Sequence, residues 1–284
     1  MTERASVKEI EEKARAIRRH VVEMTANAGV GHQGGPLSAA DMFAALYFNV
    51  LRVDPNRPAW PDRDRFVLSK GHAASGFYAT LAERGFFPVE ELLTFGLINS
   101  RLQLHPDMHM LPGVEASTGS LGQGISIAVG MALAGKMDKK DYRVYSMISD
   151  GESQEGQVWE AAMFAGNHGL DNLTVLLDNN DVQQCGNVSI QNDVHPLPEK
   201  WRAFKWNVLD IDGHSVPAIL EAIEQAKAAK GKPTVIIAHT IKGKGVSFME
   251  GEFEWHSKPL SKELAEQALS ELAAVGAPEN AELA

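Results

Sequence analysis

Cysteine is nearly absent from this sequence: Cys185 is the single one among 284 residues. One thiol excludes an internal disulfide framework and a zinc site built from several thiolates. Such low cysteine use is typical of reducing compartments, so we expect a cytoplasmic protein.

Long apolar runs and clustered positive charge are also missing. No stretch of the sequence approaches the roughly 20 apolar residues that span a bilayer. The first 20 residues are charged throughout, without the apolar core of a signal peptide. We therefore expect no membrane role. The 27 Lys and Arg are outnumbered by 37 Asp and Glu and form no basic cluster, which argues against a nucleic-acid partner.

What the chain does contain suffices for a large core. Hydrophobic residues make up 44% of it, and no Pro/Ser-rich or single-sign stretch marks a linker. We predict one domain over residues 1–284, with an amphipathic N-terminal helix at 7–26 and a C-terminal helical extension at 263–274. Ser38 is predicted to cap a second helix that runs through Val50.

Strand-like and helix-like segments alternate through the second half of the chain. Apolar, β-branched runs at 143–149, 173–177, 208–211 and 234–238 are separated by helical patterns at 156–168 and 216–229, and a shorter apolar run lies at 65–69. This alternation predicts an α/β fold with a mainly parallel sheet and helices on both faces.

Two glycine-rich segments are predicted to be loops. Residues 29–36 (GVGHQGGP) contain His32, and residues 117–124 (STGSLGQG) lead directly into a predicted helix at 125–134. So many glycines in a short stretch disfavour regular structure.

Polar residues follow two of the predicted strands. Asp150, Gly151 and Glu152 come after the strand ending at Ser149, and 178–180 (DNN) follows the next strand. Either group alone is most simply a turn. Their separation, 180 − 150 = 30 residues, is the size of one βαβ crossover, so the fold would bring them together. Asp150 and Asn180 would then offer a carboxylate and an amide oxygen to a hard cation such as Mg²⁺.

At these residues the sequence resembles the transketolase family. The resemblance covers nearly the whole chain. It rests on several motifs in order: 31–32 (GH), 64–72 (DRFVLSKGH), 111–113 (LPG), 118–124 (TGSLGQG), 154–156 (QEG) and 255–256 (WH). It implies a thiamine diphosphate-binding fold, and within that fold the domain that binds the diphosphate group.

The resemblance also implies a cofactor site. Asp150, Asn180 and the carbonyl of Val182 resemble the ligands of Mg²⁺, for which Ca²⁺ or Mn²⁺ could substitute. The residues implied to bind thiamine diphosphate are His72, Gly119, Leu121, Asp150, Gly151, Glu152, Asn180 and His256.

The same resemblance implies the catalytic residues. His32 and His105 resemble the histidines that contact a donor sugar, and Glu155 resembles a carboxylate at the contact between paired active sites. The complete implied catalytic set is His32, His72, His105, Glu155 and His256. The sequence departs from the family pattern at Ser149, where glycine is common, and at Gln33, where proline is common.

The largest departure is the end of the chain, which stops before the family's pyrimidine-binding and C-terminal domains. The sequence resembles the N-terminal subunit of split transketolases. This implies a separate C-terminal subunit, a homodimeric contact giving an α2β2 assembly, and transfer of a two-carbon ketol group from a ketose or its phosphate to an aldose or its phosphate. Two alternatives stay open: a related enzyme for an unusual sugar, such as a sulfonated one, and a non-catalytic thiamine diphosphate-binding module.

Overall fold

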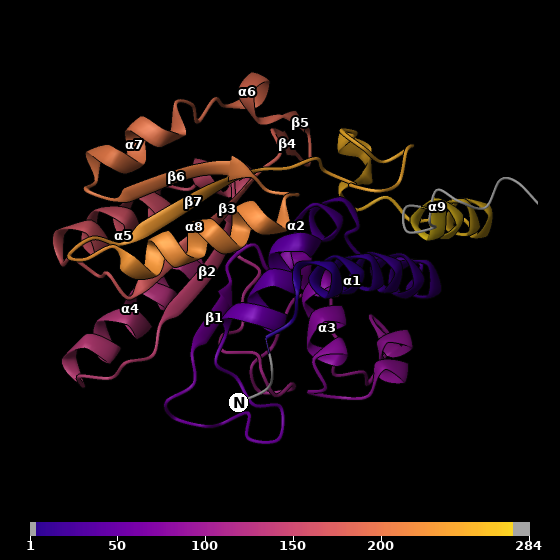
Figure 1. Cartoon of the computed structure of the whole chain (residues 1–284). Helices are drawn as coiled ribbons and strands as arrows, with labels where there is room; N and C mark the ends of the chain where they lie inside the picture. The colour runs from indigo at the N-terminus through magenta and orange to yellow at the C-terminus, as the bar shows by residue number, and fades with distance from the viewer. Residues whose placement is uncertain (1–3, 275–284) are drawn as a thin grey trace, which may run out of the picture.

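A five-stranded parallel sheet forms the centre of the computed structural model, which describes residues 4–274 (Figure 1). Every pair of neighbouring strands is parallel. In the order of the sheet, the strands are β1 (Arg65–Leu68), β2 (Val144–Ser149), β3 (Leu173–Asn179), β7 (Thr234–His239) and β6 (Asn207–Asp212). The predicted mainly parallel α/β fold is confirmed.

Helices cover both faces of this sheet. Successive residues of a strand point to opposite sides, so buried strands of apolar residues need a covering layer on each face. Phe66 and Met147 pack into a core that also contains helix residues such as Phe43 and Phe77. This core is enclosed by α1 (Val7–Ala28), α2 (Gly34–Ala45), α3 (Ala74–Glu83) and α8 (Val216–Ala228).

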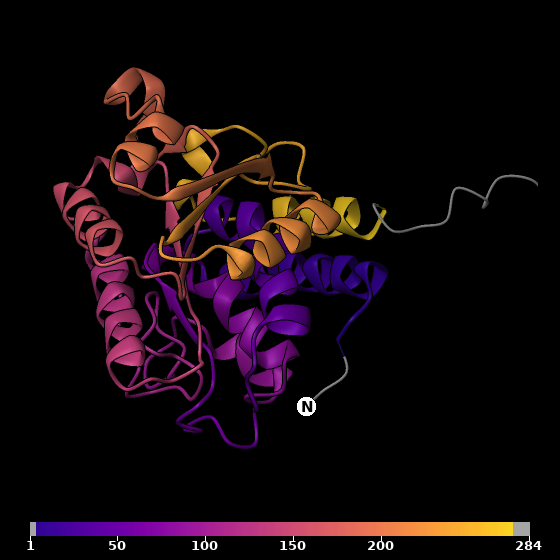
Figure 2. The same ribbon diagram turned by 60° about the vertical axis from the view of Figure 1, so that its left-hand side comes forward.

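The opposite face has a second core. Val67 and Ile148, each next in sequence to a residue of the first core, pack there with Trp201. The covering helices are α4 (Gln123–Met137), α5 (Gly156–Asn167) and α7 (Leu197–Ala203). Figure 2 shows α4 and α5 on one side of the sheet and α1, α3 and α8 on the other.

Smaller elements complete the description. The hairpin β4 (Val182–Gln183) and β5 (Gly186–Asn187) and the short helix α6 (Val188–Gln191) follow β3, and α9 (Lys262–Ala274) packs against α1. Helix α9 agrees with the predicted C-terminal helix, whereas residues 275–284 of the predicted domain lie outside the described residues.

The start of α2 differs from the sequence-based expectation. The helix begins at Gly34, so Ser38 lies inside it and does not cap it. The Ser38 hydroxyl donates to a carboxylate oxygen of Asp178 at 2.6 Å and lies 2.9 Å from the carbonyl oxygen of Gly35. A partner 140 residues away therefore outweighs the local capping preference of serine.

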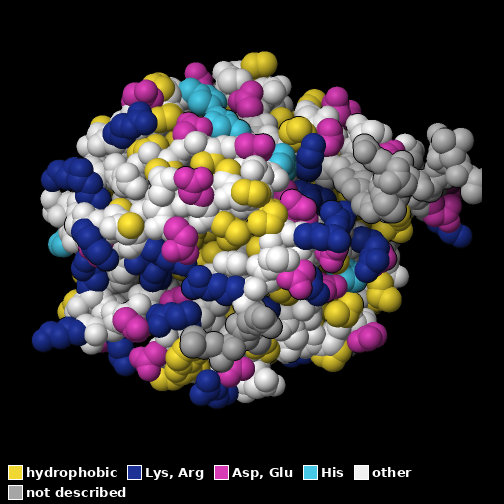
Figure 3. Space-filling view, viewed as in Figure 1, with side chains coloured by type: hydrophobic (Ala, Val, Ile, Leu, Met, Phe, Trp, Pro, Cys, Tyr) yellow, Lys and Arg dark blue, Asp and Glu magenta, His cyan; other side chains and the backbone are white. Residues whose placement is uncertain are grey.

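Surface features are ordinary for a folded chain. Figure 3 shows Lys and Arg side chains interspersed with Asp and Glu over the face that it presents. Within residues 4–274, no helix combines the length and hydropathy that crossing a membrane requires.

Glycine at position 166 is required by the packing of α5. A Cβ atom there would lie 1.8 Å from the backbone oxygen of Phe204. We expect Gly166→Ala to lower the free energy of unfolding by about 1 to 3 kcal/mol, because the chain after α7 must move. In contrast, Gly130→Ala in α4 meets nothing within 4 Å and should raise stability by about 0.5 to 1 kcal/mol. Urea unfolding of both variants tests this pair, and equal effects would contradict it.

Candidate active site

The tips of β2 and β3 lie side by side, as the spacing of their polar residues predicts. Ser149 is in register with Asp178, so the residues that follow both strands share one edge of the sheet. The Asp150 carboxylate accepts the N–H of Gly151 at 2.7 Å and the N–H of Asp181 at 2.5 Å. The backbones of the two tips are thus joined through one carboxylate.

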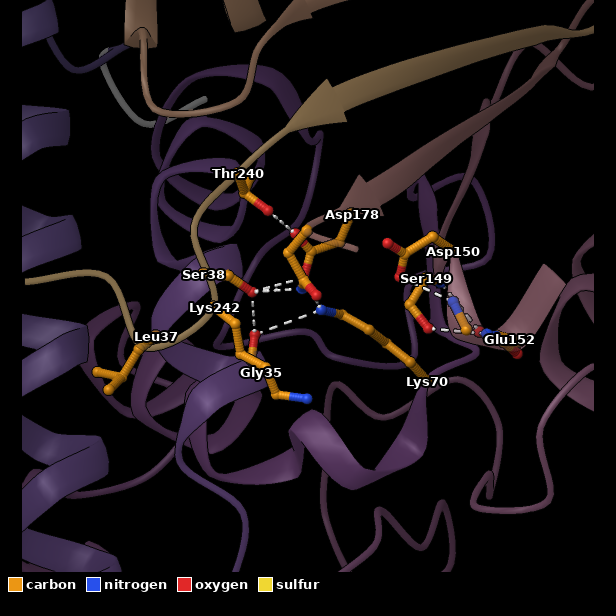
Figure 4. A network of polar contacts seen from close by, with 12 residues as sticks. Gly35, Leu37, Ser38, Lys70, Ser149, Asp150, Glu152, Asp178, Thr240 and Lys242 are labelled. Carbon is orange, nitrogen blue, oxygen red and sulfur yellow. Dashed lines mark hydrogen bonds and ion pairs between the residues drawn. The ribbon is translucent and has the colours of Figure 1, made fainter. Parts of the chain in front are cut away.

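Asp178 is an unexpected member of this edge. Its side chain is fully buried in β3 and forms an ion pair with Lys70, which is also buried (Figure 4). Ser38 and Thr240 donate hydroxyl hydrogen bonds to the same carboxylate. Burial alone would raise the pKa of Asp178, but Lys70 and these hydrogen bonds outweigh it and hold the pKa below its usual value.

Asp150 has a different electrostatic environment. Burial, reinforced by repulsion from Asp178, raises the pKa of Asp150 to about 6, although its two backbone donors and the charge of Lys242 act in the opposite direction. Within residues 4–274 it forms no ion pair. A buried carboxylate without a paired cation is a favourable ligand for a metal ion.

A second lysine lies close to this edge. Lys242 is almost fully buried, and its Nζ donates to the Val182 carbonyl at 2.8 Å and lies 3.1 Å from Nδ1 of His256. Burial lowers the pKa of Lys242 to about 8. Sequence analysis missed both Lys70 and Lys242. Each follows a strand by two or three residues, the position at which parallel sheets bind ligands, and this signal could have identified them.

The residues at the strand tips fit a magnesium ion that is shared with phosphate oxygens. The side-chain oxygen of Asn180 and the carbonyl of Val182 follow β3, beside Asp150. Within the described chain, no group of three or more His, Cys, Asp and Glu residues could hold a metal on its own. Mg²⁺ commonly uses one or two carboxylates and completes its shell with phosphate and water, so the set is suitable for it.

Four histidines from separate segments converge beside the two lysines. The ring centroid of His32 lies 5.3 Å from that of His72, 6.0 Å from that of His105 and 5.1 Å from that of His256. Burial lowers the pKa of His32 to about 4 and that of His256 to about 3, with smaller contributions from Lys242. Burial also lowers the pKa values of His72 and His105. All four imidazoles are therefore neutral at pH 7.

Glu152 connects the glycine-rich segment at 117–124 to the strand tips. Its buried carboxylate accepts the Ser69 hydroxyl at 2.5 Å and the N–H of Gly122 at 2.8 Å. Gly122 has a φ of 81°, a conformation that favours glycine. A Cβ on Gly119 would lie 3.1 Å from the His105 ring. Close packing against His105 thus explains the glycine at position 119, and backbone conformation explains the glycine at position 122.

A cavity of about 370 Å³ lies over these groups. Two of the predicted site residues, Asp150 and His105, do not line the cavity. Asp150 is buried beneath the strand tip, and the His105 ring packs against Gly119. The predicted residues that line the cavity are His32, His72, Gly119, Leu121, Gly151, Glu152, Glu155, Asn180, Val182 and His256, and Lys70 and Lys242 line it as well.

Comparison with known proteins shows the family to which the chain is similar. Residues 10–275 match the family described as "Transketolase, thiamine diphosphate binding domain". The chain is 48% identical to the 6-deoxy-6-sulfo-D-fructose transketolase subunit SqwG of Clostridium sp. (strain MSTE9), over 95% of this chain and 98% of that protein. It is 40% identical to an apulose-4-phosphate transketolase subunit of Phocaeicola vulgatus, over 94% of each.

Single-chain transketolases are similar over only part of their length. The chain is 42% identical to Homo sapiens transketolase, covering 93% of this chain and 42% of that protein. The crystal structure of the Campylobacter jejuni enzyme superposes with a TM-score of 0.89 at 34% identity, over 95% of this chain and 43% of that one. The chain thus spans less than half of these enzymes. The resemblance to subunits of transketolases is confirmed.

The histidine cluster predicts an unusual titration. We expect the imidazoles of His32 and His256 to stay neutral at pH 5, because burial lowers their pKa values to about 4 and about 3. Since these folded-state values lie below the ordinary 6.5, both residues contribute stability above pH 6.5 that is lost as the pH falls toward the folded-state values. Carbon-detected NMR of the ring Cε1 signals, assigned with His32→Gln and His256→Gln, measures this. Either signal titrating near pH 6.5 would contradict the burial of that ring.

Proposed function

The chain belongs to the transketolase family, in its thiamine diphosphate-binding N-terminal domain, and from this we propose that it is the cofactor-anchoring subunit of a two-chain transketolase. The observation that supports this proposal most directly is Asp150: a buried carboxylate without an ion-pair partner among residues 4–274, beside two lysines at convergent strand tips. Such an arrangement suits a divalent cation together with a diphosphate.

In this proposal each cofactor group has its own residues. Asp150, the side-chain oxygen of Asn180 and the Val182 carbonyl hold Mg²⁺. The N–H of Gly151, His72, His256 and the ammonium group of Lys242 bind the diphosphate. Lys242 now donates to the Val182 carbonyl, so a cation bound there would direct this ammonium group toward the anion.

The glycine-rich segment holds the cofactor rings. Gly119 and Leu121 line the cavity on the side of His105, and Glu152 acts by fixing this segment through Gly122. Bound thiamine diphosphate supplies the electron sink for cleaving a carbon–carbon bond next to a carbonyl. Neutral His32 and His105 can each accept a proton from, or donate a hydrogen bond to, the oxygens of a donor sugar at pH 7.

The substrates that we propose are a ketose donor and an aldose acceptor, with or without phosphate. A sulfonated sugar is the second candidate, because the chain is 48% identical to a 6-deoxy-6-sulfo-D-fructose transketolase subunit over 98% of that protein. A purely structural cofactor module is disfavoured, because such a module has no use for His32 and His105 close to each other beside the cofactor cavity.

The assembly that we propose has two copies of this chain and two copies of a C-terminal subunit. Two relatives of nearly equal length carry the word "subunit" in their names, which supports a separate partner. Glu155 is exposed at the start of α5 and lines the cavity, a position suited to the contact between paired sites. The single cysteine supports a cytoplasmic location.

Asp150→Asn tests the cofactor site, because it removes the charge and nearly preserves the size. In the complex with the partner subunit, we expect magnesium-dependent affinity for thiamine diphosphate to fall more than about tenfold, or about 1.4 kcal/mol. Asp138→Asn, on the exposed end of α4, is the matched control and should bind normally. Isothermal titration calorimetry measures both, and unchanged affinity in Asp150→Asn would exclude this carboxylate as a metal ligand.

The need for a partner subunit is tested by turnover. We expect the purified chain to show no ketol transfer alone and to gain activity when the C-terminal subunit is added with thiamine diphosphate and Mg²⁺. A coupled assay with ketose phosphate and sulfonated ketose donors distinguishes the two substrate classes. Robust transfer by this chain alone would refute the two-chain proposal.

A further inference from the structure

The proposed function gives no role to His214, a histidine next to the site whose two ring nitrogens both have partners. His214 lies in the turn between β6 and α8 and is largely buried. Its Nδ1 lies 2.8 Å from a carboxylate oxygen of Asp41, and its Nε2 accepts the backbone N–H of Ile241 at 2.9 Å. One imidazole thus joins α2 to the segment that follows β7.

These two contacts determine the tautomer of the His214 ring. A backbone N–H can only donate, so Nε2 must carry a lone pair and no proton. The proton of the neutral ring is therefore on Nδ1, from which it is donated to Asp41. A carboxylate that fixes the tautomer of a histidine in this way also fixes the orientation of the ring.

Asp41 is itself held firmly. Arg18 of α1 donates to both of its oxygens, at 3.2 Å and 2.5 Å, and a third guanidinium nitrogen donates to the Leu37 carbonyl at 3.1 Å. Burial would raise the pKa of Asp41, but Arg18 and His214 outweigh it and hold the pKa below its usual value. The histidine is thus fixed to a charged anchor within the helical layer.

Ile241 matters because Lys242 is the next residue. The flanking backbone is fixed on both sides: Thr240 N–H donates to Asn179 at 3.1 Å, and Gly243 N–H donates to Gly34 at 3.0 Å. Between them, the N–H of Ile241 is bonded to the His214 side chain. Loss of this acceptor would allow the peptide group at Ile241, between these two anchors and next to Lys242, to rotate.

We propose that His214, oriented by Asp41, is a positioning residue that holds the backbone at Ile241 and so places the Lys242 ammonium group at the cofactor cavity. This inference rests on the proposed function, in which Lys242 binds the diphosphate. The pair does not line the cavity, so its effect on the cofactor is indirect, and Lys242 is the lining residue adjacent in sequence to the Ile241 N–H that His214 accepts.

Two variants of His214 separate this role from simple packing. In His214→Gln the side-chain oxygen can replace Nε2 as acceptor for Ile241, whereas His214→Asn is too short to reach it. In the complex with Mg²⁺ and the partner subunit, we expect His214→Asn to weaken thiamine diphosphate binding about tenfold, the effect of one hydrogen bond. We expect His214→Gln to bind nearly as tightly as the wild type. Calorimetry measures the affinities, and turnover at saturating cofactor should recover in both variants.

A double-mutant cycle with Lys242→Met completes the test. Once the ammonium group is absent, His214→Asn should cause no further loss of affinity. Equal losses in the Gln and Asn variants, an additive loss in the Lys242→Met background, or no loss in His214→Asn would each overturn the inference. Thermal unfolding of all variants shows whether they fold. A wild-type complex that binds no thiamine diphosphate would instead refute the proposed function, and the inference with it.

Discussion

The buried ion pair between Lys70 and Asp178 is the interaction on which the organisation of the site depends. Both side chains are almost wholly excluded from water, and a charge in such a place costs several kcal/mol unless it is paired. The pair joins β3 to the residues after β1, and hydroxyl groups of Ser38 and Thr240 bring α2 and the segment after β7 to the same carboxylate. Four segments that are distant in sequence thus meet at one point.

Pairing of Asp178 with Lys70 gives the two neighbouring carboxylates different roles. Asp178 is neutralised within the chain, whereas Asp150, on the adjacent strand tip, is stabilised by two backbone N–H groups and repelled by Asp178. A divalent cation would relieve this repulsion, which is why we propose Asp150 as a metal ligand. The glycine-rich segment is held over the same edge by Glu152, and the Lys242 segment by His214. Asp150, Asp178 and His214, which do not line the cavity, thus help to shape it together with Lys70 and Glu152, which do.

Sequence reasoning recovered the parallel sheet and the adjacency of Asp150 and Asn180, because apolar periodicity and the length of one crossover determine both. The four histidines came from the family resemblance and not from spacing. Lys70, Lys242 and the burial of Asp178 were missed, since a lysine is by default an exposed residue. The burial of Lys70 depends on a partner 108 residues away, and periodicity within one segment carries no information about such a contact.

The central claim is that the tips of β2 and β3 jointly hold a metal ion that binds the diphosphate. It is tested most directly by a crystal structure of the two-subunit complex grown with thiamine diphosphate and Mn²⁺, with diffraction recorded at the manganese edge. The account predicts one anomalous peak between Asp150, Asn180 and the Val182 carbonyl, adjacent to the diphosphate. A peak elsewhere, or a diphosphate bound away from these residues, would contradict it.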